Sequence, residues 1–267
     1  AGQAAGTLSG NVATGGSTSM KNVIAALTEG FAEVEPGVTV SYDPTGSGAG
    51  ITGATDKTLD IGLSSRALKD DEKSAVDGTV VALDGIAIVV NKDSKVADLT
   101  VEQLKKMFTG EITNWKDVGG KNQEIVAFQR GEDSGSQTLF KKLLIQGGEL
   151  MTPPSELAPA AMGELVDSIA DYNNSANAIG FSVYYYIDQM YSKPGLRLLA
   201  VDGVTPSNDT LADGSYPLCN DFYAVIHPDA AADSPERCLY DWLDTADGIA
   251  CIQKAGYVPA QSAAKEN

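Results

Sequence analysis

Two spacings of hydrophobic residues alternate along this chain. Apolar residues at every second position, as in residues 38–42 and 196–200, are typical of strands with one buried face. Apolar residues three and four positions apart, as in residues 20–31 and 162–169, are typical of helices with one buried face. Segments of the two kinds follow one another over most of the chain. We therefore expect an α/β fold with largely parallel strand pairing.

Two longer runs stand out from this alternation. Residues 79–90 form an apolar, β-rich run interrupted only by Asp84 and Gly85, and residues 218–226 form a second strand-like run. Long unbroken strands can connect two lobes of a protein. A carboxylate inside such a run is expected to be partly buried, and a buried carboxylate needs partners. The alternative is that Asp84 is a strand-end residue that caps a neighbouring segment.

Local signals indicate where several helices begin and end. Residues 98–108 have an amphipathic pattern, in which Thr100 and Gln103 form a predicted capping box and Gly110 ends the helix. Trp115, shortly after this helix, is expected in the core. Two closing helices are predicted over residues 235–243 and 247–255.

Three short loops of small residues each lie between a predicted strand and a predicted helix. They are residues 14–19 (TGGSTS), 45–50 (TGSGAG) and 134–136 (SGS), the last preceding a helix over residues 137–145. A helix N-terminus offers unpaired backbone N–H groups and a partial positive charge, so it can bind an anion. Arg130 adds a guanidinium fork beside the third loop. The alternative is that Ser134 merely caps its helix, with Asp133 favouring the helix dipole.

The charge balance restricts the classes of partner. The chain has 267 residues, with 36 acidic against 19 basic side chains and a net charge of −17, which argues against nucleic acid. This charge also repels anions at long range. An anion would have to be bound by short-range donors in a closed site, because salt screens the outer field over about 8 Å. No apolar run is long enough to predict a membrane span.

The residues needed for catalysis or metal binding are scarce. His227 is the only histidine, and the sequence has no nucleophile elbow, no HExxH and no Walker motif. A phosphatase that uses Ser47 or Ser134 is the least favoured function, because such a nucleophile needs a base or a metal. We therefore expect no enzyme activity, no metal and no cofactor.

The sequence allows two states of the cysteines and predicts a flexible chain start. Cys238 and Cys251 could pair, which would suit an oxidising exterior, or all three cysteines, with Cys219, could be buried thiols. Residues 1–6 are small and are expected to form a flexible tether.

Six short motifs together resemble the phosphate-binding receptors of bacterial phosphate ABC importers, which are periplasmic or tethered to the cell surface. In chain order they are TGGSTS at 14–19, GSGAG at 46–50, DIGLSSR at 60–66, DGI at 84–86, FTGEITNW at 108–115, and Arg130 followed by SGS at 134–136. Each motif alone is weak evidence for this family. Six motifs in the same order over nearly the whole chain are specific evidence for it.

The resemblance implies a two-lobed periplasmic-binding-protein-like fold of type II. Each lobe would have a mixed, mainly parallel sheet flanked by helices, and the anion would bind in the cleft between them. Residues 1–84 and 225–267 would form lobe I, and residues 85–224 would form lobe II. Two strands, near residues 83–88 and 219–225, would cross between the lobes.

The resemblance also implies which residues bind phosphate. The first lobe would contribute Thr18 through its hydroxyl, Ser19 through its backbone N–H, Ser47 and Ser65. The second would contribute Arg130, Ser134, Gly135 and Ser136. Glu132 would orient the Arg130 guanidinium.

One position departs from the family pattern. Many relatives carry an aspartate where Ser65 stands, and that aspartate accepts the hydrogen of protonated phosphate and repels sulfate. A site made only of donors would not discriminate between the two anions. We expect Asp84 to be the replacement acceptor in the phosphate site, with Asp60 as the reserve candidate.

Together these features predict a high-affinity receptor that binds inorganic phosphate and delivers it to the membrane permease of an ABC importer. A receptor for another tetrahedral oxyanion, such as sulfate, is the alternative that Ser65 keeps open. We expect a monomeric lipoprotein outside the cytoplasm, either periplasmic or tethered to the outer face of the cell membrane by an N-terminal lipid anchor absent from this chain.

Overall fold

The computed structural model describes residues 6–132, 134–171, 175–190 and 194–260. The chain divides into two compact units: unit 1 consists of residues 1–83 and 220–267, and unit 2 of residues 84–219. The chain passes from one unit to the other inside strand β4 (Asp77–Asn91) and returns inside β10 (Cys219–Ile226). The tether predicted at the chain start lies outside the described residues, except for Gly6.

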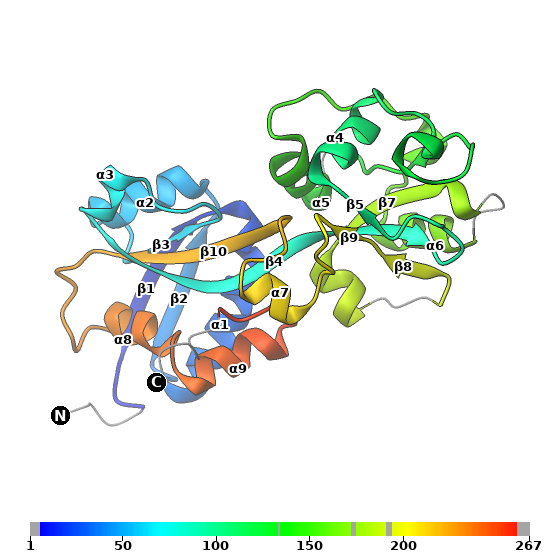
Figure 1. Cartoon of the computed structure of the whole chain (residues 1–267). Helices are drawn as coiled ribbons and strands as arrows, with labels where there is room; N and C mark the ends of the chain where they lie inside the picture. The colour runs from blue at the N-terminus through cyan, green and yellow to red at the C-terminus, as the bar shows by residue number, and fades with distance from the viewer. Residues whose placement is uncertain (1–5, 133, 172–174, 191–193, 261–267) are drawn as a thin grey trace. The chain divides into compact units, whose positions relative to one another are not determined.

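Unit 1 is built on strands in the order β2-β1-β3-β10 (Figure 1). These are β1 (Gly10–Gly16), β2 (Val38–Asp43), β3 (Ile61–Ser64) and β10. Strand β1 pairs in parallel with β2 and β3, whereas β10 runs antiparallel to β3. The loops after β1, β2 and β3 therefore meet at one edge of the sheet, which is where ligands bind in open α/β sheets.

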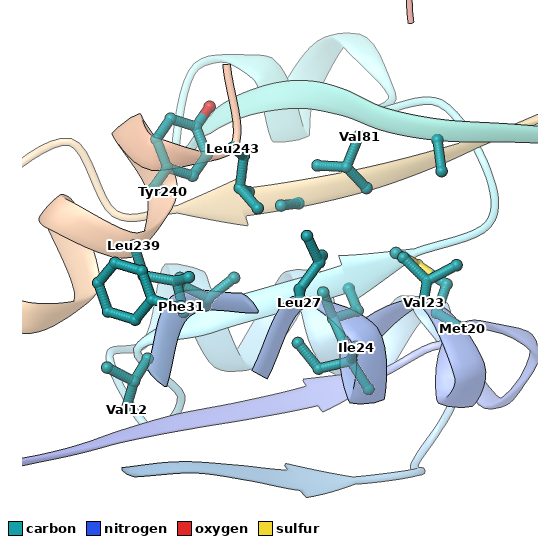
Figure 2. Close-up of a cluster of buried hydrophobic side chains, with 14 of the residues drawn as sticks. Val12, Met20, Val23, Ile24, Leu27, Phe31, Val81, Leu239, Tyr240 and Leu243 are labelled. Carbon is teal, nitrogen blue, oxygen red and sulfur yellow. The ribbon is translucent and has the colours of Figure 1, made fainter. Parts of the chain in front are cut away.

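Helices cover both faces of the unit 1 sheet (Figure 1). One face carries the 3-10 turn η1 (Thr18–Met20), α1 (Lys21–Val34), α8 (Pro235–Trp242) and α9 (Ala246–Lys254). The other carries α2 (Ser47–Thr55) and α3 (Asp70–Lys73). The helical spacing seen in the sequence buries Leu27 and Phe31 of α1 in one cluster with Val12 of β1 and Leu239 of α8 (Figure 2).

Unit 2 is built around β4. Strand β4 pairs antiparallel with β7 (Ala178–Val183) and β8 (Leu196–Leu198), and β6 (Val126–Ala127) pairs in parallel with β7. Its helices are α4 (Val101–Thr109), α5 (Gly135–Phe140), α6 (Met162–Asp171) and α7 (Asn208–Ala212). Shorter helical turns are η2 (Trp115–Val118), η3 (Lys141–Ile145), η4 (Ser155–Leu157), η5 (Ser175–Asn177) and η6 (Tyr186–Met190).

The core of unit 2 joins α5 to the sheet. Phe140, the last residue of α5, stacks on Phe181 of β7 with 3.9 Å between ring centroids, and Phe108 of α4 meets Phe140 edge-on. Trp115 is buried, as the sequence predicted, and its Nε1–H donates to the Asn177 carbonyl at 2.9 Å. This packing holds the last residue of α5 against the strands.

Two local predictions are wrong. Residues 98–99 are strand β5 (Asp98–Leu99), which pairs with β9 (Ala200–Val201), so α4 begins only at Val101. Residues 196–200 likewise form two short strands, β8 and β9, instead of one. In both places, backbone pairing with a distant strand outweighs the local pattern.

The predicted signals at the two ends of α4 are confirmed. Thr100 and Gln103 exchange the two hydrogen bonds of a capping box, each at 3.0 Å. Gly110 ends the helix with φ 84°, a left-handed conformation that favours glycine.

Candidate functional site

The nine residues predicted to bind phosphate fall into two groups, one in each unit. Unit 1 holds Thr18, Ser19, Ser47 and Ser65, and unit 2 holds Asp84, Arg130, Ser134, Gly135 and Ser136.

In unit 1, backbone hydrogen bonds connect the loops that follow the three parallel strands. The Ser17 N–H donates to the Leu63 carbonyl at 2.8 Å, and the Gly46 N–H donates to the Gly16 carbonyl at 2.7 Å. The Tyr42 hydroxyl donates to the Ser17 carbonyl at 2.7 Å. These bonds fix the loop that leads into η1, where Thr18 and Ser19 lie.

Ser47 and Ser65 are in direct contact. Ser47 is the first residue of α2, and its Oγ accepts the Ser65 N–H at 3.0 Å and lies 3.2 Å from Ser65 Oγ. The structure therefore brings together two of the predicted ligand residues from different loops. Their hydroxyls and the free N–H groups of the first turn of α2 provide neutral donors for an anion.

Close backbone packing sets the position of α2. A Cβ atom added at Gly50 would lie 2.8 Å from the carbonyl oxygens of Gly15 and Leu63, and one added at Gly62 would lie 2.2 Å from the Gly50 carbonyl oxygen. Only glycine permits this approach of the helix to β1 and β3. The glycine-rich loop therefore has a packing function as well as a place at the proposed site.

In unit 2, the predicted strand–turn–helix around Arg130 is confirmed. Ser134 caps α5 by accepting the Gln137 N–H at 3.4 Å, and Ser134 Oγ lies 2.7 Å from Ser136 Oγ. Arg130 Nη1 donates to Ser136 Oγ at 3.3 Å, and Nη2 donates to the Ala160 carbonyl at 2.8 Å. A guanidinium, two hydroxyls and a helix N-terminus therefore lie together. Asp133 lies outside the described residues.

Glu132 has another partner than the one that the sequence suggested. Its carboxylate accepts a hydrogen bond from Lys141 Nζ at 2.7 Å, and both side chains are exposed. Lys141 is nine positions further on, directly after α5. Glu132 thus forms a surface ion pair in this structure.

Two glutamines that the sequence analysis missed support the Arg130 segment. Gln137 Oε1 accepts the Arg130 N–H at 3.0 Å, and Gln137 Nε2 donates to Gln129 Oε1 at 3.1 Å. Gln129 Nε2 donates in turn to the Met151 carbonyl at 2.9 Å. Both glutamines are almost fully buried, with 2 % exposure at Gln129 and 1 % at Gln137. No spacing in the sequence marks such amides in advance.

Asp84 is buried, as its place in an apolar run predicted, with 7 % exposure. Its Oδ1 accepts the Gly85 N–H at 2.8 Å and the Tyr185 N–H at 3.4 Å. Burial raises the pKa of Asp84 from 3.8 to about 6, and the two backbone bonds oppose this effect. The bond to Tyr185 also agrees with the alternative that Asp84 caps a neighbouring segment.

Asp60, the reserve acceptor, supports the sheet of unit 1. Its Oδ2 accepts the Ala13 N–H at 2.8 Å, and the Asp60 N–H donates to the Ala13 carbonyl at 2.8 Å. The carboxylate therefore already has a structural partner at the junction of β1 and β3.

The described residues form neither a metal site nor a membrane-spanning helix. No group of three His, Cys, Asp or Glu side chains among them is arranged to hold a metal ion. None of their helices combines the length and apolar character that crossing a bilayer requires. Cys238 and Cys251 are thiols and are not joined to each other: Cys251 Sγ donates to the Ala26 carbonyl at 3.1 Å, and Cys238 Sγ to the Ala232 carbonyl at 3.8 Å.

Comparison with known proteins identifies the family. The family model for the PBP superfamily domain matches residues 1–245. The phosphate-binding protein PstS of Bacillus subtilis is 31% identical over 261 residues, which cover 94% of this chain and 81% of that protein. This chain belongs to the PstS family within that superfamily.

Solved structures agree with the PstS assignment. An ABC-type phosphate transport receptor from Vibrio cholerae is 27% identical with a TM-score of 0.79, covering 93% of this chain and 99% of the other. A phosphate ABC transporter substrate-binding protein from Clostridium perfringens, crystallised with bound phosphate, is 30% identical with a TM-score of 0.62, covering 94% and 99%. The resemblance inferred from the six motifs and the two-lobed periplasmic-binding-protein fold are thereby confirmed.

Proposed function

We propose that this chain binds inorganic phosphate and delivers it to the membrane permease of a phosphate ABC importer. The observation that carries the proposal is the match of 94% of the chain to a PstS protein whose name describes it as phosphate-binding. The chemistry of the two groups of predicted ligand residues supports it.

The unit 2 group provides the positive charge that a phosphate receptor needs. Arg130 and Ser134 each lie within hydrogen-bond distance of Ser136 Oγ at the N-terminus of α5. Each hydrogen bond to a charged group contributes about 1.5–3 kcal/mol. Five or more such bonds are sufficient for roughly micromolar or tighter binding after the costs of association.

The proposal assigns the ligand to both groups of residues. Thr18, Ser19, Ser47 and Ser65 would donate from unit 1, and Arg130, Ser134, Gly135 and Ser136 from unit 2. The two units, whose bounds of 1–83 with 220–267 and 84–219 differ from the expected lobes of 1–84 with 225–267 and 85–224, would then act as the two lobes of the receptor. The hinge would lie in β4 and β10.

Asp84 would be the acceptor for the phosphate hydrogen. Its Oδ1 receives the backbone bonds from Gly85 and Tyr185, and we assign the phosphate hydrogen to Oδ2. A carboxylate with a pKa of about 6 is ionised at pH 7, where it can accept this hydrogen. Sulfate has no such hydrogen and would be repelled.

The remaining parts of the proposal concern location and partners. The receptor would be a monomer outside the cytoplasm, in the periplasm or tethered by a lipid anchor, and would contact the permease but not nucleic acid. It would perform no catalysis, in keeping with the substrate-binding role for which relatives are named.

Calorimetry with phosphate and with sulfate at pH 7 tests the proposal. We expect phosphate to bind with one-to-one stoichiometry and micromolar or tighter affinity, and sulfate to bind at least about 100-fold more weakly. Arg130→Met should abolish measurable phosphate binding, whereas Arg237→Met, which removes a guanidinium of α8 outside the predicted ligand set, should preserve it. No heat with phosphate for a folded wild-type protein would overturn the proposal, and equal binding of sulfate would favour a general oxyanion receptor.

A further inference from the structure

Three hydrogen bonds connect the backbone of Arg130 to the Met151 carbonyl through two buried glutamine side chains. This chain of hydrogen bonds runs from the Arg130 N–H to Gln137 Oε1, from Gln137 Nε2 to Gln129 Oε1, and from Gln129 Nε2 to the Met151 carbonyl, over distances of 3.0, 3.1 and 2.9 Å. All members belong to unit 2. Gln129 and Gln137 are excluded from water, so each bond that they make is difficult to replace.

The two ends of this chain fix its direction. The Arg130 N–H can only donate, so the Gln137 atom that faces it must be the oxygen. The Met151 carbonyl can only accept, so the Gln129 atom that faces it must be the nitrogen. Both requirements leave the Gln137 nitrogen facing the Gln129 oxygen, which is the arrangement observed. The chain therefore has one satisfied orientation.

Gln137 also connects the two parts of the unit 2 group. Its side chain holds the backbone of Arg130, while its own N–H donates to Ser134 Oγ, the cap of α5. Ser134 Oγ meets Ser136 Oγ, which accepts from the Arg130 guanidinium. Gln137 thus connects the backbone of Arg130 to the cap of α5.

We infer that Gln137 is a positioning residue of the phosphate site and that Gln129 fixes the orientation of its amide. The inference rests on the proposed function. Neither glutamine is needed to touch phosphate. Their effect comes from holding Arg130 and the first turn of α5 in the arrangement that the anion requires, because small displacements of ligand groups weaken binding strongly.

Gln137→Glu tests this role with little change in shape. In its neutral form, the new carboxyl group can still accept from the Arg130 N–H and donate to Gln129 Oε1. In its ionised form it can only accept, so it opposes the Gln129 oxygen and disrupts the chain. Burial should place its pKa inside the range accessible to the experiment.

The measured quantity is the phosphate Kd of the variant divided by that of the wild type, from pH 5.5 to pH 8.5. The ratio cancels the titration of phosphate itself. We expect it to rise about tenfold or more with pH, which corresponds to about 1.4 kcal/mol per factor of ten. Gln129 lies one hydrogen bond further from the Arg130 N–H than Gln137, so Gln129→Glu should give a smaller rise of the ratio in the same direction. This variant replaces Gln137→Glu in the experiment if Gln137→Glu does not fold.

Gln146→Glu is the matched control, since it adds the same charge at an exposed glutamine of unit 2. Its ratio should stay flat over the pH range. If the Kd ratio of both Gln137→Glu and Gln129→Glu does not change with pH, even though the variants are less stable, the two glutamines have only a structural role. That result would overturn this inference and leave the proposed function intact. Failure of the wild type to bind phosphate would instead overturn the proposed function, and the inference with it.

Discussion

The buried carboxyl group of Asp84 makes the stability of this protein depend on pH. Its pKa in the folded protein is about 6, above the ordinary value of 3.8, because burial disfavours the charged form. The folded state therefore binds this proton more tightly than the unfolded state. Its contribution to stability is present in full below about pH 4 and is lost as the pH rises through about 6.

Asp84→Asn should remove this dependence. An amide cannot ionise, and its oxygen can still accept the Gly85 and Tyr185 N–H groups that Oδ1 accepts now. We expect the variant to have a higher free energy of unfolding than the wild type at pH 7, by on the order of 2 kcal/mol, with the gap closing towards pH 4. Urea unfolding at several pH values measures it, and a gap that does not change with pH would contradict the prediction.

The same substitution tests the choice of acceptor. If Asp84 accepts the phosphate hydrogen, Asp84→Asn should reduce the preference for phosphate over sulfate by about tenfold or more. The amide nitrogen that replaces the accepting oxygen cannot accept this hydrogen, and the neutral amide no longer repels sulfate. Asp60→Asn is the comparison, and its amide oxygen can still accept the Ala13 N–H. A preference that falls with Asp60→Asn and stays with Asp84→Asn would transfer the role to Asp60.

At this scale, the sequence predicts some residues well and others not at all. The burial of Asp84 follows from its apolar neighbours, and Ser134 and Thr100 follow from the chemistry of helix caps. Gln129 and Gln137 have no such signal, because a buried amide is recognised only by partners from other segments. The pairing of Glu132 with Lys141 depends on how α5 places residue 141, which periodicity does not fix.

At the scale of elements, two helix caps of similar chemistry should behave differently. Thr100 caps α4 and Ser134 caps α5, each by accepting a backbone N–H through its hydroxyl. Replacing either by alanine should cost about 1 kcal/mol of stability. Only Ser134→Ala should also weaken phosphate binding, by about tenfold, because only Ser134 belongs to the predicted ligand set.

Thermal unfolding and calorimetry on both variants separate the two effects. Thr100→Ala is the control for loss of a cap without loss of a ligand. An equal loss of phosphate affinity in both variants would mean that helix stability, and not the Ser134 hydroxyl, sets the affinity.

Element types were predicted more reliably than element partners. The helical spacing in α1 and the alternation in β2 identify those elements, because each face has one environment along its whole length. The start of α4 was misplaced because Asp98 and Leu99 pair with Ala200 and Val201, about a hundred positions away. A local pattern contains no information about such a partner.

At the scale of the whole chain, unit 1 combines the two ends of the sequence. Strand β10 pairs with β3 although 165 positions separate Ile226 from Ile61 in the sequence. Periodicity marks both segments as strands and says nothing of their pairing. The six motifs allowed the topology to be predicted. They match a known family in the same order along nearly the whole chain, and members of one family share their topology.

The net charge of −17 gives a prediction for the rate of phosphate capture. An acidic protein repels an anion at long range, and salt shortens that repulsion from about 30 Å at 0.01 M to about 8 Å at 0.15 M. The association rate constant for phosphate should therefore increase with ionic strength, by roughly twofold to tenfold over this range. The dissociation rate constant should change less, because the proposed donors act at short range inside the site. Stopped-flow mixing at constant pH with added sodium chloride measures both constants. An association rate that falls with salt would mean that the local field of Arg130 outweighs the net charge, and that phosphate is attracted along a positively charged path in spite of the acidic surface.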